Sequence, residues 1–230
     1  MRPSRMTKGK ATAPPKLLQH YTSVPNLLKI LRGKKLVLGD PSRWIDKNDA
    51  FLIEEYRKQN DIPKIFALCF CMENEISLFW ETYAKGENGC RIDFVPKILL
   101  KVCKVSTNVR ADGRFRKGKV SYLTLKRVQR RSCQIEDFPF IKRHPFRNEH
   151  EYRILWEGKT RLKSIGVEID LGSIHRITLS ARMPAHKRER LRRSLSLLLP
   201  RKVKVCTTTL YINERWINAF KRMHNKQVGQ

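Results

Sequence analysis

The chain has 230 residues, a length that fits one domain of ordinary size, with or without a tail. Lysine and arginine number 49 against 21 acidic residues, a formal net charge of +28, and 40% of the residues are hydrophobic. The apolar content suffices for a folded core, and the charge favours a polyanionic partner, with nucleic acid ahead of an anionic membrane surface. A basic protein that lies beside nucleic acid without reading it is the plainer alternative.

Several classes of protein are disfavoured by what the sequence lacks. No stretch approaches the ~18 apolar residues of a membrane span, and the first residues lack the apolar core of a secretion signal. The six cysteines show no C-x-x-C pair and no zinc spacing, which is typical of buried thiols in a reducing compartment. We therefore expect a cytoplasmic protein. The motifs G-x-x-x-x-G-K-[ST], G-x-G-x-x-G and H-E-x-x-H are also missing, which disfavours a nucleotide-hydrolysing loop, a Rossmann site and a zinc protease.

The chain begins with a basic segment and a strand–helix unit. Residues 1–16 hold five Lys/Arg, no acid and two adjacent prolines, which indicates a flexible basic arm. A strand over 16–21 is followed by a helix that Ser23 caps, that Pro25 begins and that Gly33 ends in a left-handed conformation.

The middle of the chain alternates strands and helices. A strand over 34–38 precedes a helix that Asn48 caps, with Phe51, Leu52 and Tyr56 facing inward. A hairpin-like turn is expected over 111–114. Strands are predicted over 65–71, 90–95, 102–109 and 119–123, and helical segments over 77–84, from Pro96, and over 125–133.

The last third predicts strands over 151–156, 166–171, 175–179 and 203–208, and helices over 184–199 and 214–223. Leu191, Leu195 and Leu198 mark the buried side of the longer helix. The fold class is α+β, with two mostly antiparallel sheets and short packed helices. We expect one domain over 17–210 and a C-terminal helix and tail over 211–230.

Two basic regions are candidates for phosphate contact. Eleven Lys/Arg and one acid lie within 101–131, and arginines crowd one side of the helix over 184–199. Solvated helix faces are the alternative explanation of both. The candidate nucleic-acid contacts are Arg127, Arg130, Arg131, Arg188, Arg192 and Arg193.

Three polar or aromatic clusters could carry chemistry: His20-Tyr21, Trp80 with Tyr83, and Glu149-His150-Glu151. A hydrogen-bonded structural histidine is the commoner explanation of the first. The glutamates stand at the entry to a predicted strand, and from the residue types alone charge pairing with neighbouring arginines is favoured. The functional interpretation is a carboxylate that stabilises a developing cation or takes a proton.

The order of several sequence blocks resembles a bacterial domain family of unknown function that opens with an HYTS block. The similarity covers residues from about 17 to 210. Its blocks are His20-Tyr21-Thr22-Ser23 with the following Leu-Leu-x-Ile-Leu, Leu68-Cys69-Phe70, Trp80-x-x-Tyr83-Ala84, Gly89, and Lys142-x-His144-Pro145-x-x-x-x-Glu149-x-Glu151-Tyr152-Arg153.

This layout is in turn similar to the H-Y-E class of ADP-ribosyltransferases, the diphtheria-toxin and poly-ADP-ribose-polymerase type. The resemblance implies NAD as substrate, with His20 at a ribose and Tyr83, together with Trp80, stacked on the nicotinamide ring. Tyr21 would line the same pocket. Glu151 would stabilise the oxocarbenium-like charge, and Glu149 is the alternate, or the group that orients the acceptor. The second tyrosine usual in the nicotinamide pocket has no clear counterpart here.

The resulting hypothesis is an NAD-dependent ADP-ribosyltransferase-like protein that acts on or near nucleic acid. A toxin, phage or defence context, with an antidote or phage protein as partner, is a further expectation. The alternative is a non-catalytic basic nucleic-acid-binding protein that keeps the fold.

Overall fold

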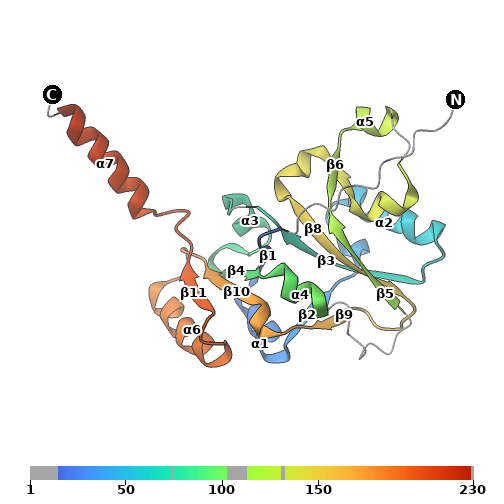
Figure 1. Cartoon of the computed structure of the whole chain (residues 1–230), viewed down its shortest axis with the longest axis horizontal. Helices are drawn as coiled ribbons and strands as arrows, with labels where there is room; N and C mark the ends of the chain where they lie inside the picture. The colour runs from blue at the N-terminus through green and yellow to red at the C-terminus, as the bar shows by residue number, and fades with distance from the viewer. Residues whose placement is uncertain (1–14, 74, 103–112, 131–132, 229–230) are drawn as a thin grey trace.

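The computed structural model (Figure 1) describes residues 15–73, 75–102, 113–130 and 133–228. Most of the predicted basic arm, Arg131 and nearly all of the strand expected over 102–109 lie outside the described residues.

A seven-stranded sheet forms the centre of the fold, in the order β11-β10-β4-β1-β3-β8-β5. The pair β10–β11 is parallel and all other pairs are antiparallel. The strands are β1 (Leu18–Ser23), β3 (Lys64–Cys71), β4 (Gly89–Phe94), β5 (Gly113–Lys119), β8 (Glu151–Gly158), β10 (Ile174–Leu179) and β11 (Lys204–Thr207).

The other described strands form two small sheets. In one, β2 (Lys35–Leu38) pairs with β9 (Ile165–Glu168) in antiparallel orientation, and in the other, β6 (Ser121–Leu123) pairs with β7 (Ile141–Arg143) in parallel orientation. The α+β class is confirmed, with the strands arranged as one large sheet and two small ones.

Short helices connect these strands. The α-helices are α1 (Val24–Gly33), α2 (Lys47–Gln59), α3 (Ser77–Thr82), α4 (Pro96–Val102), α5 (Leu125–Arg130), α6 (Ala185–Leu198) and α7 (Glu214–Val228). The 3₁₀ turns are η1 (Pro41–Arg43), η2 (Gly86–Asn88), η3 (Ile135–Phe140), η4 (His144–Glu149) and η5 (Leu171–Ser173).

Strand pairing assigns the residues of β1, β3 and β8 to the two faces of the large sheet. Gln19 pairs with Cys71, and Cys71 pairs with Glu151. Because directly paired residues of neighbouring strands point to the same side of a sheet, these three lie on one face, which we call the carboxylate face. Successive side chains of a strand alternate between the two faces. His20 lies on the other, the apolar face, opposite Ile92 of β4.

Most of the core lies on the apolar face. Here α1, the β2–β9 pair and α6 pack against the large sheet and bury its aliphatic and aromatic side chains. The carboxylate face is covered by α2 over β3 and β8, and by α3 over β1 and β3. Side chains that seal the two faces include Leu27, Leu36, Ile165 and Leu195 on the apolar face, and Ile53, Tyr56, Phe79 and Trp80 on the carboxylate face.

Local signals predicted the helices better than their caps. Pro25 lies in the first turn of α1, as expected, but Lys34 rather than Gly33 adopts the left-handed conformation, with φ 48°. In α2 the cap is Asp46, whose carboxylate accepts from two backbone N–H groups, and not Asn48. Asp and Asn cap equally well, so the sequence alone did not decide between them.

Two further expectations needed correction. Phe51 is 58% exposed, because Ile53 and Tyr56 form the inner side of α2. Gly113 and Arg114, expected in a turn, begin β5 and pair with β8. The inner side of α6 is as predicted, with Leu195 fully buried.

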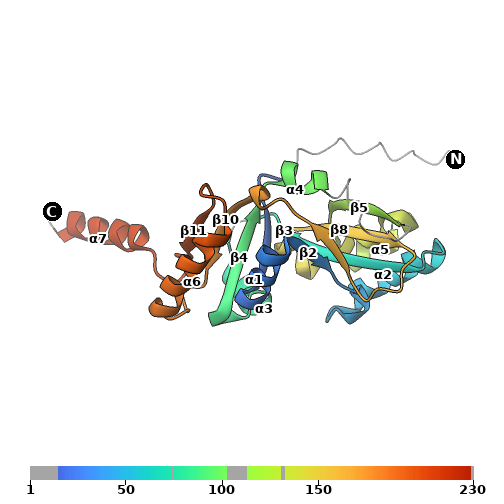
Figure 2. The ribbon, with the colours of Figure 1, turned by 90° about the horizontal axis from the view of Figure 1, so that it is seen from below.

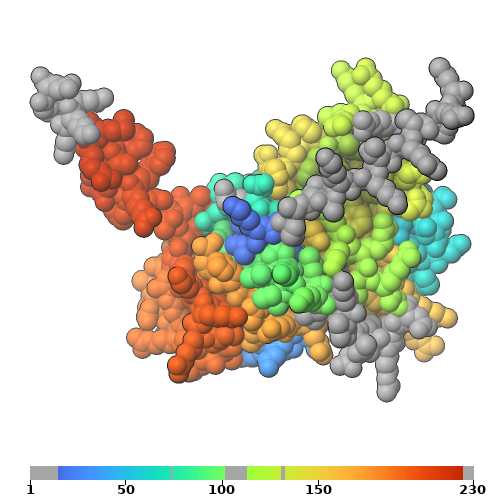
Figure 3. Space-filling model, in the orientation of Figure 1, coloured from blue at the N-terminus to red at the C-terminus, as the bar shows by residue number. Residues whose placement is uncertain are grey.

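The C-terminal helix α7 extends away from the rest of the molecule (Figures 1 and 2), and its separation is also clear in the space-filling view (Figure 3). Residues 209–224 are all exposed. Within the described part of the chain, no helix has the length and apolar character required to cross a membrane.

Candidate active site

The two glutamates predicted to matter meet at the start of β8, on the carboxylate face. Glu149 ends η4, Glu151 begins β8, and His150 between them has a left-handed backbone with φ 41°. The His150 carbonyl accepts a hydrogen bond from Met72 N–H at 3.0 Å, which ties this bend to the end of β3. The bend brings both carboxylates to the same ammonium group.

That ammonium group belongs to Lys142 on β7. Its Nζ donates to Glu149 Oε2 at 2.6 Å and to Glu151 Oε2 at 3.3 Å. Asp49 of α2 lies 3.5 Å from the same nitrogen. Burial works to lower the pKa of Lys142, but Glu151 and Glu149 outweigh it and raise that pKa, so the ammonium form persists.

A fully buried arginine holds the inner side of the cluster. Arg153 donates from Nε to Glu151 Oε1 at 2.6 Å and from Nη2 to Oε2 at 3.1 Å, and it bonds both oxygens of Asp49. Its guanidinium carbon lies 4.9 Å from the ring centroid of Trp44. The charge pairing weighed for Glu151 is thus present as a buried, bidentate contact.

The two glutamates differ in accessibility and in pKa. Burial works to raise the pKa of Glu151, but Arg153 and Lys142 lower it to about 2, so this group is an anion at neutral pH. Burial raises the pKa of Glu149 against the opposing effect of Lys142. The Glu151 side chain is 6% exposed and the Glu149 side chain 15%. Two carboxylates whose pKa values are pushed apart are typical of a site that divides roles between them.

Tyr83 joins this cluster from the end of α3. Its hydroxyl donates to Glu149 Oε1 at 2.7 Å, across 66 residues of sequence. Burial and Glu149 raise the pKa of Tyr83, so it stays a neutral donor. Tyr83 is 44% exposed, so part of its side chain faces solvent beside the carboxylates. Tyr83 is therefore in direct contact with Glu149, and Lys142 links Glu149 to Glu151.

His20 does not join them. Its ring lies on the apolar face, 5.8 Å from the Phe70 ring centroid, and its Nδ1 lies 3.4 Å from the Cys69 carbonyl oxygen. Burial lowers the pKa of His20, which favours the neutral imidazole. The alternation of β1 places this ring on the opposite side of the sheet from Glu151, and the contacts match the structural histidine weighed from the sequence.

Trp80 and Tyr21 are packing residues in this structure. Trp80 is fully buried, and its Nε1 donates to Glu75 at 2.7 Å. Tyr21, 7% exposed, makes an edge contact with the Trp80 ring at 5.6 Å. Burial of Trp80 leaves Tyr83 as the aromatic ring of this pair with a solvent-facing surface, so stacking on a ligand by Trp80 is not supported.

The predicted nucleic-acid contacts do not gather into one surface. Arg127 and Arg130 are exposed on α5, at the opposite end of the molecule from α6 in both Figure 1 and Figure 2. On α6, Arg193 is exposed and pairs with Glu189 at 3.4 Å. Arg188 donates to the carbonyls of Ala181 and Met183, and Arg192 to Thr207 Oγ1 at 2.7 Å.

Three further residues of the cluster, of which Lys142 and Asp49 are buried, were not singled out from the sequence. Lys142 was present in a family-like block, but a lone lysine gives no sign that it will be buried. Asp49 stood beside the expected cap of α2, and Tyr122, whose hydroxyl accepts from the Glu151 N–H at 2.8 Å, lies on β6. For Arg153 the sequence did hold a sign of its contact with Glu151. The two residues are two positions apart in a predicted strand, so their side chains lie on the same face.

Similarity of this chain to known proteins was found among solved structures. No family model matches the chain, and no curated protein matches it, so the resemblance to the HYTS-type family stays a prediction. Among solved structures, DarT from Thermus sp. 2.9 in complex with ADP-ribosylated ssDNA is 14% identical, with a TM-score of 0.41 over 84% of this chain and 94% of that chain.

The same protein in complex with NAD+ is 12% identical with a TM-score of 0.38, and in complex with carba-NAD+ 13% identical with a TM-score of 0.39. Each alignment covers 84% of this chain and 96% of that chain. TM-scores this low carry no argument about the ligand or reaction of this chain, so the site is interpreted from its own geometry.

Proposed function

We propose that the chain is an NAD-dependent ADP-ribosyltransferase-like protein that acts on or near nucleic acid. The observation that carries the proposal is the contact of Tyr83 with Glu149 at 2.7 Å, beside Lys142 and Glu151. Tyr83 lies far in sequence from the other three, and the H-Y-E resemblance selects Tyr83, Glu149 and Glu151 for the same pocket.

The cluster has the groups that such a transfer requires. The bond between the ribose C1′ and the nicotinamide nitrogen breaks, nicotinamide departs with the electron pair, and the acceptor attacks C1′ while its proton passes to a base. A carboxylate beside the sugar stabilises the oxocarbenium-like charge. The partly exposed ring of Tyr83 offers a flat surface to a flat leaving group.

We assign the substrate contact to Glu149 rather than Glu151. Both glutamates have each oxygen in a hydrogen bond, but those of Glu151 are held by the buried cations Arg153 and Lys142 and its side chain is only 6% exposed. One oxygen of Glu149 accepts instead from the partly exposed Tyr83. Glu149 is more accessible and has a raised pKa, which suits a group that exchanges a proton. Glu151 then acts as a positioning residue that fixes Lys142. The role at a ribose that the resemblance implies for His20 stays a prediction that this geometry does not support.

The test is transfer of label from NAD. Purified wild-type protein is incubated with labelled NAD and single-stranded DNA, duplex DNA, RNA or cell extract, and compared with Glu149→Gln. We expect the variant to lose about 10²–10³-fold in rate, because it loses a charge that stabilises the transition state. Nicotinamide release and transferred label are both measured.

Glu73→Gln is the matched control, because Glu73 is also a glutamate close to His150, with its oxygen 3.4 Å from that ring, but is 52% exposed outside the cluster. It should retain nearly wild-type rates. Absence of nicotinamide release from the wild-type protein with every acceptor would end the enzyme proposal, and equal losses in the two variants would end the assignment of Glu149.

The second candidate function is nucleic-acid binding without catalysis. The formal charge of +28 and the exposed cations of α5 favour it as much as they favour recruitment of a nucleic acid to an enzyme. Binding that survives Glu149→Gln, with no NAD consumption by the wild-type protein, would select this candidate.

The biological setting rests on the sequence resemblance alone. A toxin, phage or defence role, a cytoplasmic location and an antidote or phage partner protein are parts of the same proposal, as is a single domain over 17–210.

A further inference from the structure

A hollow at the far end of β3 gathers basic side chains from three separate segments. Its lining includes Lys64 at the start of β3, Arg43 from η1, and Arg161 and Lys163 from the connection between β8 and β9. Asp40 is the one carboxylate among the lining residues. The hollow encloses about 240 Å³, roughly eight times the ~30 Å³ that one water molecule occupies in the liquid.

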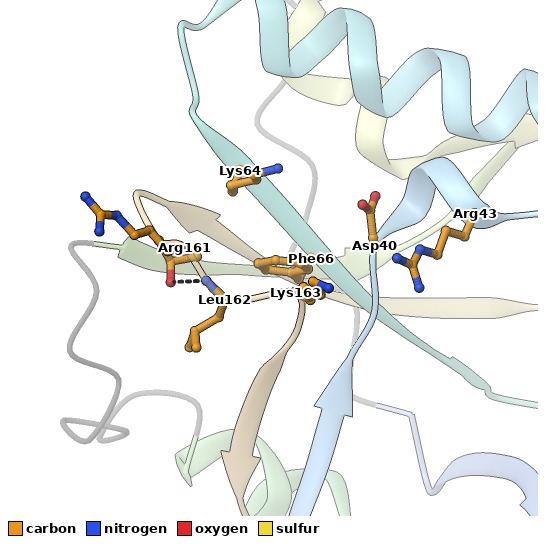
Figure 4. A pocket seen from close by; sticks show the side chains of 8 residues that line it. Asp40, Arg43, Lys64, Phe66, Arg161, Leu162 and Lys163 are labelled. Carbon is orange, nitrogen blue, oxygen red and sulfur yellow. Dashed lines mark hydrogen bonds between the residues drawn. The ribbon is translucent and has the colours of Figure 1, made fainter.

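The side chains converge on this hollow from different directions (Figure 4). Lys163 lies beside the ring of Phe66, Lys64 and Arg43 extend towards Asp40 from opposite sides, and Arg161 points away from them. Within the described part of the chain, none of the three convergent cations forms an ion pair with a carboxylate. Converging like charges repel one another, and a bound anion relieves that repulsion.

The backbone that carries these cations is held in place. Gly39 and Ala67 exchange two hydrogen bonds, at 2.9 and 2.8 Å, which fasten the segment before η1 to β3. The Leu162 N–H donates to Thr160 Oγ1 at 3.1 Å within the β8–β9 connection. The floor is Phe66, which is buried against Trp156 with ring centroids 5.9 Å apart. The backbone beneath these side chains is therefore fixed before any ligand arrives.

Asp40 does not cancel the positive charge. Its carboxylate accepts from the Ser42 N–H at 2.9 Å as the cap of η1. Partial burial works to raise the pKa of Asp40, but the bonds from Ser42 and the charges of Lys64 and Arg43 lower it. The three cations Arg43, Lys64 and Lys163 thus outnumber the one carboxylate of the lining, which already caps η1.

We propose that this hollow, defined by Arg43, Lys64 and Lys163, is a binding site for a phosphate group. A guanidinium fork with two ammonium groups is a combination suited to phosphate oxygens. The site is distinct from the carboxylate cluster, because Lys64 lies seven residue steps along β3 from Cys71, which is beside Glu151, roughly 23 Å of extended strand. A backbone phosphodiester of nucleic acid and the phosphate of a free nucleotide present the same chemistry to it.

The experiment compares two triple variants with the same loss of charge. The first changes Arg43, Lys64 and Lys163 to glutamine. Binding of a fluorescent single-stranded oligonucleotide is measured by anisotropy, with inorganic phosphate and a nucleoside monophosphate as competitors and as direct ligands in calorimetry. We expect the hollow variant to bind at least 10-fold more weakly at 0.15 M salt and to lose competition by inorganic phosphate.

The control changes Lys29, Arg32 and Lys97, three exposed residues elsewhere, to glutamine and should lose less than 3-fold. Thermal unfolding confirms that both variants fold, and the single change Lys163→Gln keeps the test valid if the triple variant does not.

The ligands distinguish the two sources of phosphate. If the oligonucleotide depends on the hollow, the source is a nucleic-acid backbone; if only the monophosphate and inorganic phosphate do, it is a free nucleotide. Equal losses in both triple variants, or no effect of inorganic phosphate on the wild-type protein, would overturn the proposal. No NAD turnover enters this test, so its failure is distinguishable from failure of the proposed enzyme.

Discussion

At the scale of single residues, the cluster around Lys142 has an unusual balance of charge. Three carboxylates, from Asp49, Glu149 and Glu151, surround two cations, Lys142 and Arg153. In a chain with a formal charge of +28, this is a small site with one excess negative charge. Such a site favours a developing positive charge, and burial strengthens the interaction because the local dielectric is low.

The lowered pKa of Glu151 predicts a specific acid sensitivity. A carboxyl whose pKa falls from 4.5 to about 2 on folding stabilises the protein fully above pH 4.5, and this stabilisation is lost as the pH falls towards 2. Glu151→Gln should therefore lower the free energy of unfolding by about 3–5 kcal/mol at pH 7, because it breaks a buried ion pair. The deficit should shrink between pH 4.5 and pH 2, as measured by urea unfolding across that range.

Glu168→Gln serves as the control, because Glu168 pairs with Lys35 at 3.8 Å and both side chains are about half exposed. Exposed pairs contribute little, so this variant should follow the wild-type curve. A Glu151→Gln deficit that is the same at pH 7 and pH 3 would contradict the pairing of this residue.

At the scale of elements, α6 and α7 differ in what they bury. Leu195 of α6 is fully buried against the large sheet. By contrast, α7 exposes Trp216, Phe220 and Met223, by 67%, 52% and 55%. A helix gains its stability in a protein chiefly from packing one face against the rest, and α7 packs little of its surface.

Removal of residues 214–230 should consequently leave the fold intact. We expect the free energy of unfolding to change by less than about 0.5 kcal/mol, since surface changes away from packed features have small effects. Leu195→Ala in α6 should instead cost about 2–5 kcal/mol, because it opens a cavity in the core. Chemical unfolding monitored by circular dichroism compares the two, and a truncated chain as destabilised as Leu195→Ala would show that α7 packs on the body.

At the scale of the whole molecule, positive charge is spread over several surfaces. The exposed arginines of α5 and of α6 lie at opposite ends (Figures 1 and 2), and the hollow of Arg43, Lys64 and Lys163 is a third basic surface. A charge distribution of this kind attracts a polyanion from many directions. The orientation of the bound polyanion is then set by contacts at particular sites on the surface.

Affinity for nucleic acid should therefore fall steeply as salt rises. For a single strand, the logarithm of the affinity falls by ~0.7 per contacted phosphate for each tenfold rise in salt, so contact with three or more phosphates predicts a slope of about −2 or steeper. Titrations of a labelled oligonucleotide between 50 and 300 mM salt, roughly the range over which this effect is measured, provide the value. An oligonucleotide analogue with an uncharged backbone is the control, and a flat response to salt would remove the argument from charge.

Much of the local structure follows from the sequence because it depends on near neighbours. The apolar run of β3, the leucine spacing of α1 and α6 and the proline of α1 all predicted elements that are present. Near neighbours are less informative where two residues are equally good helix caps, as are Asp46 and Asn48 at the start of α2. The left-handed residue after α1 is Lys34 rather than Gly33, although glycine adopts this conformation with less strain, so the local preference did not locate it.

The sequence by itself determined the α+β class and the order of most elements, and its resemblance to the H-Y-E class selected His20, Tyr83, Glu149 and Glu151 as candidate site residues. Tertiary structure decided which candidates meet. The alternation of β1 turned His20 to the apolar face, packing against Tyr21 buried Trp80, and the bend at His150 delivered both glutamates to Lys142. These outcomes depend on strand pairing between segments distant in the chain, and no local pattern records which face or which partner that pairing selects.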